Sequence, residues 1–582
     1  MCGFIVKISQ EKGGLDIRLA LESLAHRGPD ARKIFSSPTG CCVMGHNRLS
    51  VIDLSCEGTQ PMQDPSSRYS LVLNGEIYNY LELRAELSNY WTFRSKTDSE
   101  VLLAAYVKWG AGCLNYLIGM FSFAIWDEAE QSLFAARDRF GVKPFYYAVN
   151  SQGALLVASE IKALHAMGIK KEMDPVTWST YLAFGFYDHS ERTFWKNVSS
   201  LPAGHTLSWH KNNHKIEKWY DLKDRISSQI DNRADDEVQD EYLELLKNSL
   251  SLRFRSDVPV GINLSGGLDS SLLLGLINAT QKEYKSIKIF TFITGEKDYD
   301  ELPWVKRMLA HIPHSHYPCL LSPQEVPDLA AKIQGYQDEP FGGIPTIAYS
   351  KVFELARQIG VIVLLDGQGM DEQWAGYDYY KRALNENGSL ESFNYGPVQG
   401  SSGGTVFPEC LEAEFLKLAE RPQWPEPFPD RLRNLQYRDL GYNKIPRALR
   451  FNDRISMMYG TELREPFLDH RLVELSFQQP VSRKIRNGTQ KWMIRKLART
   501  LLPEEITDSP KRSVQTPQRE WLRGALKQWA NECLDEVSES FGGNWFKKDI
   551  LRQGWANFCS GKIDNSFYAW QWVSLALINR NK

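Results

Sequence analysis

Residues 258–277 read VPVGINLSGGLDSSLLLGLI, and this stretch decides the fold of most of the chain. An apolar strand pattern runs into a glycine loop, and an apolar helical pattern follows at once. A second strand pattern, SIKIFTFI at 286–293, completes a strand–helix–strand unit. Such units build parallel sheets with covering helices, so we expect an α/β domain here.

The flanking patterns set the domain organisation. Helical spacing at 237–255 and 346–359, and a buried strand pattern at 360–367, extend the α/β domain over 236–582, with an irregular excursion at 384–430. Upstream, strand patterns at 70–79, 121–127 and 132–138 alternate with helical patterns at 80–88 and 98–109. This arrangement predicts a separate antiparallel α+β domain over 1–215.

The bulk composition limits the partners. The 582 residues carry a net charge of -2, with 42% hydrophobic and 24% charged residues, which favours neither nucleic acid nor membrane as a partner. No apolar run approaches the roughly 20 residues of a membrane helix. Nine cysteines without a CxxC pair argue against a disulfide framework and a zinc site, and the reducing cytosol fits best.

The glycine loop indicates a phosphate site. In SGGLDSS at 265–271 the glycines let backbone N–H groups approach an anion at the start of a helix. No GKS or GKT follows and no GxGxxG is present, so the loop matches neither common nucleotide motif. Its form resembles the pyrophosphate loop of the ATP pyrophosphatases, although a bare SGG turn occurs in many α/β proteins.

Cys2 is a candidate nucleophile. Loss of Met1 would expose an N-terminal cysteine whose α-amine, with a reference pKa of about 7.7–8.0, could act as the general base. Cleavage of an amide also needs donors for an oxyanion, and Asn74 with Gly75 could supply a side-chain amide and a backbone N–H. Glutamine would need a cation and anions, for which Arg48, Asp98 and Glu76 are suitable.

The motifs around these residues resemble a known domain. MCGF, AHRGPD at 25–30, GHNRLSVIDLS at 45–55, QPM at 60–62, LNGEIYN, TDSE and ARDRFGVKPFYY are similar to the glutamine-hydrolysing domain of class II amidotransferases. The resemblance implies an N-terminal-nucleophile αββα sandwich in which Cys2 attacks glutamine and Asn74 with Gly75 forms the oxyanion hole. It assigns glutamine binding to Arg48, Leu49, Ser50, Val51, Ile52, Asn74, Gly75, Glu76 and Asp98.

Four further blocks resemble the synthetase domain of the glutamine-hydrolysing asparagine synthetases. They are DEPFGGIPTIAYSK at 338–351, DGQGMDEQWAGYDYY at 366–380, DRISMMYGTELREPFLDHRLVELS at 453–476 and SPKRSVQTPQREWLRG at 509–524. The resemblance implies a Rossmann-like ATP-pyrophosphatase domain, with Lys511 facing the adenylate and Asp269 and Asp371 on Mg2+. It places ATP against Leu264, Ser265, Gly266, Gly267, Asp269, Ser270, Thr294, Asp366 and Gly367.

Two positions depart from the family pattern. In DGQGMDE, Asp366 replaces a small residue and Gln368 replaces an acid that the family ties to forming the aspartyl-adenylate. The segment PKRSVQTP also lacks the usual glycine and phenylalanine after the lysine. We therefore expect Gln368 to bear on acceptor specificity. Aspartate is the default acceptor, and a sugar uronic acid or another small biosynthetic acid is the alternative.

The resemblance implies an ATP-dependent carbon–nitrogen ligase that takes ammonia from glutamine and adds it to an acyl-adenylate. The expected partners are glutamine, ATP with Mg2+ and a carboxylate acceptor, and homodimers are common among such synthetases. A sugar-phosphate or phosphoribosyl amidotransferase would share the first domain, but SGGLDSS argues against it. An inactive scaffold protein is a further alternative, which Gln368 leaves open.

Overall fold

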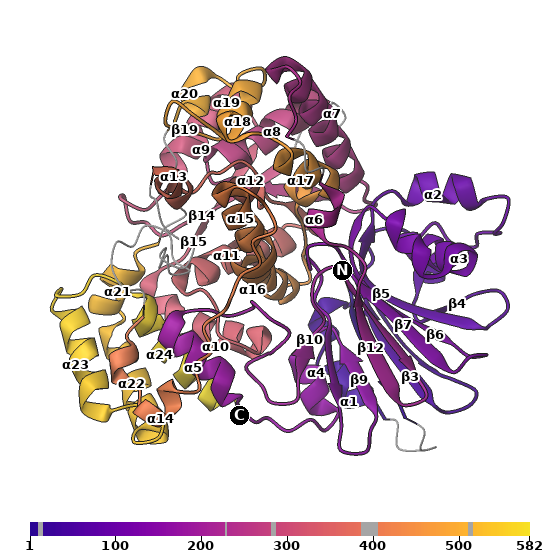
Figure 1. Cartoon of the computed structure of the whole chain (residues 1–582), viewed down its shortest axis with the longest axis horizontal. Coiled ribbons are helices and arrows are strands. Elements are labelled where there is room, and N and C mark those ends of the chain that lie inside the picture. Colours follow the sequence, from indigo (N-terminus) through magenta and orange to yellow (C-terminus); the bar gives the residue numbers. More distant parts are fainter. Residues whose placement is uncertain (10–15, 227–229, 281–286, 386–405, 510–515, 582) are drawn as a thin grey trace.

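The computed structural model describes residues 1–9, 16–226, 230–280, 287–385, 406–509 and 516–581. Figure 1 shows a strand-rich N-terminal part on one side and a larger, mainly helical part on the other. Part of the excursion expected at 384–430 lies outside the described residues, as do 510–515 with Lys511.

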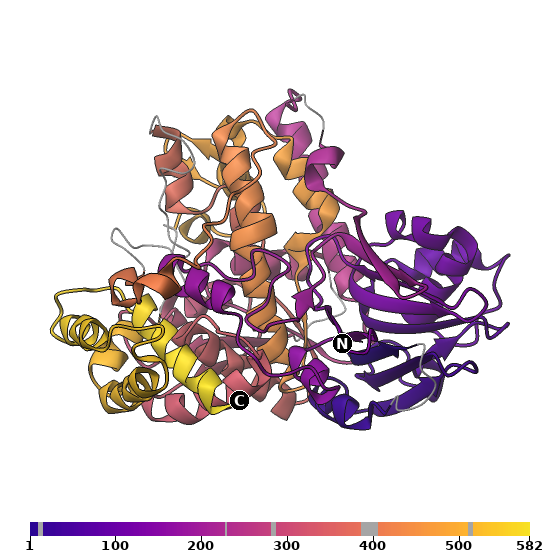
Figure 2. The same cartoon turned by 60° about the horizontal axis from the view of Figure 1, so that its bottom comes forward.

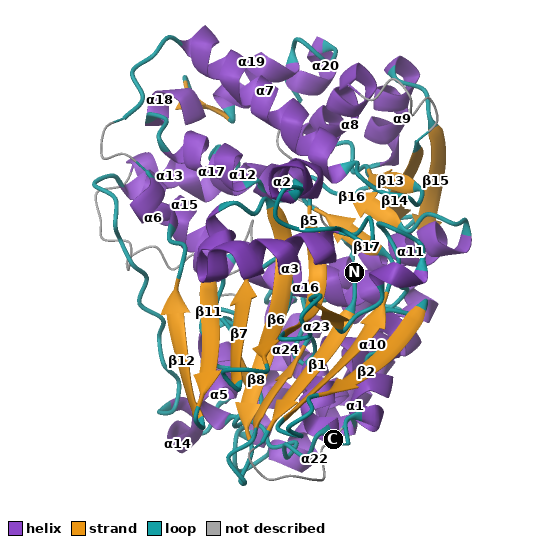
Figure 3. Cartoon of the chain, turned by 90° about the vertical axis from the view of Figure 1, so that its right-hand side faces the viewer, coloured by secondary structure: helices purple, strands orange, loops and turns teal. Residues whose placement is uncertain are grey.

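Two antiparallel sheets form the N-terminal part (Figure 3). The first has the strand order β10-β8-β9-β1-β3-β2 and the second β12-β11-β7-β6-β5-β4. Their bounds are β1 Gly3–Ile8, β2 Ala31–Ser36, β3 Cys42–Arg48, β4 Met62–Gln63, β5 Tyr69–Ile77, β6 Gly119–Asp127, β7 Ser132–Arg137, β8 Tyr146–Val149, β9 Leu155–Ala158, β10 Ser199–Ser200, β11 His205–His210 and β12 Asn213–Lys218.

The alternation of side chains along β1 explains why the sheets stack. Phe4, Val6 and Ile8 lie in the core between the sheets, whereas Ile5 packs on the opposite face. Helices α2 (Tyr80–Leu87) and α3 (Asp98–Trp109) cover the outer face of the second sheet. Helices α1 (Arg18–Glu22) and α4 (Ile161–Ala166) cover that of the first, which completes the expected αββα sandwich.

A five-stranded parallel sheet organises the rest of the chain. Its order is β15-β14-β13-β16-β17, with bounds Ser315–Leu320, Lys288–Ile293, Val260–Asn263, Val363–Leu365 and Glu462–Arg464. The principal helices are α7 Asp235–Arg253, α8 Leu268–Thr280, α9 Leu302–His311, α10 Val326–Gln337, α11 Ile344–Gln358, α12 Met370–Gln373, α13 Asp378–Asn385, α15 Arg431–Arg438, α16 Ile445–Met457, α17 His470–Phe477, α19 Trp492–Ala498, α21 Gln518–Arg523, α22 Lys527–Phe541, α23 Lys548–Cys559 and α24 Phe567–Arg580. The expected α/β class is confirmed.

The two parts of the chain pack directly against each other. Helix α5 (Pro175–Phe184) leaves the sandwich and packs among the C-terminal helices, where Ser179 Oγ donates to Phe415 O at 2.7 Å. In Figure 2 these C-terminal helices, in yellow, lie on the far side of the molecule from the sandwich. One apolar cluster also joins Val51 and Met120 of the sandwich to Ile262 and Leu365 of the parallel sheet. Apolar contacts therefore connect the sandwich with the parallel sheet.

The cysteines and the helices bear on two expectations from the sequence, those about disulfides and membrane spans. All nine cysteines are described, and none forms a disulfide. Among the helices that the structure describes, none combines the length and the apolar character required of a membrane span.

Candidate active sites

Cys2 lies directly before β1 in a small pocket of about 20 Å³. Its backbone N–H donates to Asn74 Oδ1 at 3.1 Å, and its Sγ lies 3.9 Å from Leu49 O. Burial raises the pKa of the Cys2 thiol, and the nearby N-terminal amino group lowers it. Met1 is part of the pocket wall, so removal of Met1 would widen the pocket and leave the amino group on Cys2 itself.

The neighbours of Cys2 offer hydrogen-bond donors. Because Asn74 Oδ1 accepts from Cys2, its Nδ2 is available, and this buried atom has no partner in the described part of the chain. Gly75 has a φ of 147°, and a Cβ there would lie 2.0 Å from Met120 O, so only glycine fits. An unpartnered amide beside a thiol is the arrangement that an oxyanion hole needs.

Charged side chains surround the same pocket. The Arg48 guanidinium is held by backbone carbonyls, with 2.6 Å to Ser55 O and 3.3 Å to Ile52 O. Asp98 Oδ2 accepts from the Ile77 amide at 2.8 Å, and burial raises the pKa of Asp98 to about 6. Burial also raises the pKa of Glu76 well above its usual range, and the charge of Glu462 adds to the effect.

Most of the residues predicted to bind glutamine line this one pocket. They are Arg48, Leu49, Val51, Ile52, Gly75, Glu76 and Asp98, together with Cys2. Asn74 does not line the pocket but accepts a hydrogen bond from the Cys2 backbone N–H. Ser50 does not line it either, and its backbone N–H donates to Asp30 Oδ2 at 2.7 Å. Gly58, Gln60, Thr97 and Ser99 also line it and were not predicted, although Gln60, Thr97 and Ser99 belong to motifs noted in the sequence.

The glycine loop between β13 and α8 has the expected form. Gly266 has a φ of 73°, and the Ser265 and Ser270 hydroxyls lie 3.0 Å apart across the turn. The Ser265 amide also donates to Ser270 Oγ at 3.2 Å. The loop therefore closes on the N-terminus of a 13-residue helix, which attracts an anion.

A pocket of about 300 Å³ opens on this loop. The predicted residues that line it are Ser265, Gly266, Gly267, Asp269, Ser270, Asp366, Gly367, Gln368 and Asp371. Leu264 and Thr294 do not line it: Leu264 is buried, and the Thr294 hydroxyl donates to Asp300 Oδ1 at 3.0 Å. Aromatic side chains that were not predicted, Phe292, Trp304, Tyr349 and Phe451, form much of its wall.

Lys491 was not predicted, and it joins the two candidate metal ligands. Its Nζ lies 2.6 Å from Asp269 Oδ2 and 2.5 Å from Asp371 Oδ1. Burial would lower the pKa of Lys491, but the two carboxylates raise it overall. Gly376 packs against this group, because a Cβ there would lie 1.7 Å from Asp371 Oδ1. No sequence motif marked Lys491, which is 222 residues from Asp269.

The same carboxylates fit a magnesium ion bound with ATP. Mg2+ is usually held by one or two carboxylates together with phosphate and water oxygens. Asp269 and Asp371 converge on one cation, which shows that their oxygens face a common point. The described residues contain no group of three or more potential ligand side chains, so the phosphates would have to complete the site.

Asp366, where the family pattern predicts a small residue, is enclosed by hydrogen-bond donors. It is buried, its Oδ2 accepts from Tyr349 OH at 2.7 Å, and its Oδ1 accepts from the Gly367 amide at 2.7 Å. Burial raises the pKa of Asp366. Gln368 lines the pocket beside it. The two substituted positions of DGQGMDE thus lie at the wall of one pocket, whereas most of PKRSVQTP, the third departure, lies outside the described residues.

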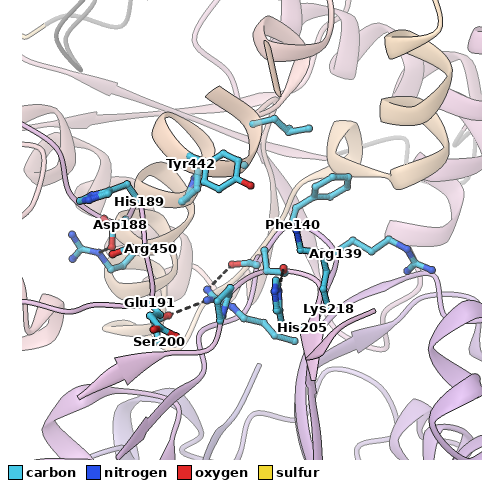
Figure 4. Close-up of a pocket in the computed structure, with 18 of the residues that line it drawn as sticks. Arg139, Phe140, Asp188, His189, Glu191, Ser200, His205, Lys218, Tyr442 and Arg450 are labelled. Atoms are coloured by element: carbon cyan, nitrogen blue, oxygen red, sulfur yellow. Dashed lines mark hydrogen bonds and ion pairs between the residues drawn. The ribbon is translucent and has the colours of Figure 1, made fainter. Parts of the chain in front are cut away.

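A third pocket, of about 350 Å³, lies where the sandwich meets the second part of the chain (Figure 4). Its wall includes Arg139 and Lys218 from the sandwich and Tyr442 and Arg450 from the helical part. Asp188 Oδ1 accepts from Arg450 Nε at 2.7 Å. None of the predicted site residues lines this pocket.

A buried thiol pocket in an αββα sandwich, combined with a phosphate loop on a parallel sheet, defines a glutamine amidotransferase joined to an ATP-using synthetase. A family model for a glutamine amidotransferase domain matches residues 1–220, and one for asparagine synthase matches residues 241–580. The chain belongs to the asparagine synthase family. Membership confirms an ATP-dependent ligase of the glutamine-hydrolysing type.

Individual relatives are similar over nearly the whole chain. Glutamine-hydrolysing asparagine synthetase 1 of Bacillus subtilis is 28% identical over 98% of this chain and 95% of its own length. Asparagine synthetase 3 of the same organism is 30% identical over 94% of this chain and 95% of its own length. The amidase chry2 of Gibberella zeae is 27% identical over 90% of this chain and 88% of its own length.

A solved structure is similar to part of the chain. The glutamine phosphoribosylpyrophosphate amidotransferase from Bacillus subtilis is 16% identical and covers 55% of this chain and 81% of its own, with a TM-score of 0.30.

Proposed function

We propose that the protein transfers ammonia from glutamine to a carboxylate that it first activates as an acyl-adenylate. The observation that carries the proposal is the occurrence, in one chain, of the Cys2 pocket and the phosphate-loop pocket with an apolar cluster between them. The two activities would divide between 1–215 and 236–582. A cytoplasmic location and a homodimer are part of the same proposal.

In the glutaminase half, Cys2 acts as the nucleophile once it is the first residue and its own amine is free to take the thiol proton. The Asn74 side-chain amide and the Gly75 N–H stabilise the oxyanion that forms on the glutamine amide. Arg48 binds the glutamine carboxylate, and Asp98 with Glu76 binds its ammonium group. Ammonia leaves, and water then cleaves the glutamyl thioester.

In the synthetase half, the acceptor carboxylate attacks the α-phosphate of ATP while residues 265–270 hold the pyrophosphate that departs. Asp269 and Asp371 would hold Mg2+, which neutralises phosphate charge when bound. Lys491 pairs with both carboxylates and would hold them beside the phosphates. Lys511, which lies outside the described residues, would face the adenylate.

Ammonia must travel between the pockets without meeting bulk water. In water most of it would become ammonium and lose the lone pair that attacks the adenylate. Val51 and Met120 of the sandwich share an apolar cluster with Ile262 and Leu365 beside the phosphate-loop pocket. This cluster supports a protected passage between the two sites.

Aspartate is the first acceptor to consider, because relatives such as the Bacillus subtilis proteins carry the name asparagine synthetase. One observation favours a different carboxylate. The described cations of the phosphate-loop pocket, Lys491 and Arg495, are both engaged, the first with carboxylates and the second with the backbone oxygens of Gln490, Thr507 and Ser509. A second carboxylate on the acceptor, such as that of aspartate, would therefore find few free N–H donors on these two side chains, whereas the aromatic wall suits a less polar acid.

The test is pyrophosphate release with ATP, Mg2+, glutamine and a panel of carboxylates headed by aspartate, with the amide identified by mass. Pyrophosphate release and asparagine formation with aspartate would establish an asparagine synthetase. Turnover only with a sugar uronic acid or another small acid would establish a specialised amidation. Absence of pyrophosphate release with every acid would refute the proposed function.

A further inference from the structure

Glu465 carries a buried carboxyl group that belongs to neither predicted site. It follows β17 directly and is 3% exposed. Neither of its carboxylate oxygens makes a hydrogen bond of normal geometry in the described part of the chain. A buried acid with so few donors is destabilising, so this carboxyl suits a ligand that supplies N–H or O–H groups.

Glu465 lines a small cavity at the junction of the two parts. The cavity measures about 10 Å³, close to the roughly 10–15 Å³ that one water-sized molecule needs. Tyr78, Met120 and Val142 of the sandwich form one wall, and Glu465 and Leu468 form the other. An ammonia molecule has the same size. The wall combines apolar side chains with charged or ionisable ones, among them those of Asp138, Arg139, Arg253, Glu465 and His470.

This cavity adjoins residues of both candidate sites. On one side, Met120 packs directly on Gly75 of the Cys2 pocket, since a Cβ at Gly75 would lie 2.0 Å from Met120 O. On the other side, the Glu465 carboxyl faces the backbone of Gln368, which lines the phosphate-loop pocket. Strands β16 and β17 pair in parallel there, and the Asp366 amide donates to Arg464 O at 3.0 Å.

The other charged groups near the cavity make hydrogen bonds elsewhere, although the Nε atoms of Arg139 and Arg253 have no partner among the described residues. Arg253 Nη1 donates to Asp469 Oδ2 at 3.0 Å, and Arg139 donates to Leu117 O at 2.8 Å. Asp138 accepts from backbone amides, among them Val142 N at 3.0 Å. His470 is neutral, because burial lowers its pKa to about 3. Near this cavity, Glu465 is therefore a hydrogen-bond acceptor whose carboxylate oxygens have no partner of normal geometry among the described residues.

We propose that this cavity holds one molecule of ammonia on its way to the acyl-adenylate and that Glu465 accepts its proton when the amide forms. The inference rests on the proposed function and extends it. As the nitrogen lone pair forms the C–N bond, one N–H proton passes to the Glu465 carboxylate. The C–O bond to AMP then breaks, AMP leaves with the electron pair, and Glu465 returns its proton to water.

The electrostatic surroundings suit this role. Burial raises the pKa of Glu465 well above its usual range, and the neighbouring Asp366 charge raises it further. Lys143 and Arg253 act in the opposite direction. A base whose pKa approaches the working pH transfers protons most effectively. The sequence placed Glu465 in a family block, but only the fold shows that it stands at the carboxyl end of a strand beside Asp366.

The experiment compares the whole wild-type enzyme with Glu465→Gln, which keeps the shape of the side chain but cannot take a proton. With the carboxylate that the wild type amidates, we expect amide formation to fall at least about 100-fold from glutamine and from ammonium chloride alike. Glutaminase activity and single-turnover pyrophosphate release without ammonia should change less than about twofold. The acidic limb of the pH profile for amide formation should disappear.

Glu474→Gln is the matched control, because Glu474 is a part-buried carboxyl nearby whose Oε1 accepts from Tyr220 OH at 3.0 Å and which does not line the cavity. It should keep amide formation near the wild-type rate. Wild-type rates and an unchanged pH profile in Glu465→Gln would overturn the inference. So would loss of glutamine-supported synthesis alone, since that result indicates a blocked passage. Failure of the proposed function would show separately, as absence of pyrophosphate release in the wild type.

Discussion

The ammonium group of Lys491 lies 2.6 and 2.7 Å from the two carboxylate oxygens of Asp269. Asp269 stands in the first turn of α8, at the end of the phosphate loop, and Lys491 directly precedes α19. The contact therefore fixes the start of one helix against the start of another. It also sets the position of a carboxylate that would meet the magnesium ion of ATP.

Substitution of Lys491 by Met tests this relationship. Without the ammonium, Asp269 and Asp371 repel each other and lose their common orientation, so we expect adenylation to fall by about 100-fold or more. Single-turnover pyrophosphate release measures the loss. Glutaminase activity at Cys2 should remain. Lys496→Met is the control, because Lys496 lies on α19, which Lys491 precedes, but pairs with Asp236 at the surface. Equal losses in both variants would contradict the assignment.

Asp269→Asn separates a metal ligand from a merely structural residue. We expect pyrophosphate release to fall sharply and the remaining activity to need a higher Mg2+ concentration, because an amide binds the ion more weakly than a carboxylate does. A magnesium titration of pyrophosphate release provides the measurement. Glutamine hydrolysis should be unaffected. An unchanged magnesium requirement would remove Asp269 from the metal site.

Cys2→Ala tests the division of labour between the two pockets. Glutamine-supported synthesis should be abolished, since the nucleophile is gone, while synthesis from ammonium chloride should continue at close to the wild-type rate. Cys41→Ala is the control, because Cys41 lies away from the pocket and should tolerate the change. The measurement is the amount of amide product formed from glutamine and from ammonium chloride. Loss of both activities in Cys2→Ala would mean that Cys2 is not confined to glutamine hydrolysis.

The sequence could single out residues that line the Cys2 pocket, because they occupy short, distinctive motifs. Cys2, Arg48, Gly75 and Asp98 come from separate motifs, and the sandwich brings them into one pocket. Their chemical roles remain predictions. The placement follows from strand geometry: β1 and β5 belong to stacked sheets, and the residues at their ends meet.

Lys491 and Glu465 show where sequence reasoning stops. A lysine before a short helix and a glutamate after a short strand carry no local pattern that distinguishes them from surface residues. Their positions depend on the parallel pairing of β16 with β17 and on the packing of α19 near α8, which are long-range contacts. Leu264 and Thr294 remain predictions as ATP-binding residues: both are buried, and neither lines the phosphate-loop pocket.

The raised pKa of Asp98, about 6, predicts how glutamine use depends on pH. Below that pH the carboxyl is neutral and cannot pair with the ammonium group of glutamine, so KM for glutamine should rise by up to about tenfold for each pH unit. Synthesis from ammonia should lack this dependence. Asp98→Asn should raise KM at neutral pH and remove the change below pH 6. Initial rates at varied glutamine from pH 5 to 8 test the prediction, and a flat wild-type KM would contradict it.

Gln368→Glu restores the acid that the family pattern has at this position and tests what the exchange does to the acceptor. Gln368 lines the phosphate-loop pocket beside Asp366, so a new carboxylate there adds negative charge close to a second buried acid. If Gln368 suits the pocket to an acceptor other than aspartate, the variant should lose about tenfold or more in pyrophosphate release with that acceptor. Glutaminase activity should remain unchanged. The measurement is the carboxylate panel run on wild type and variant side by side, with Gln490→Glu as a control outside the pocket. The same acceptor preference in both proteins would show that Gln368 is a tolerated variation and that specificity resides elsewhere in the wall.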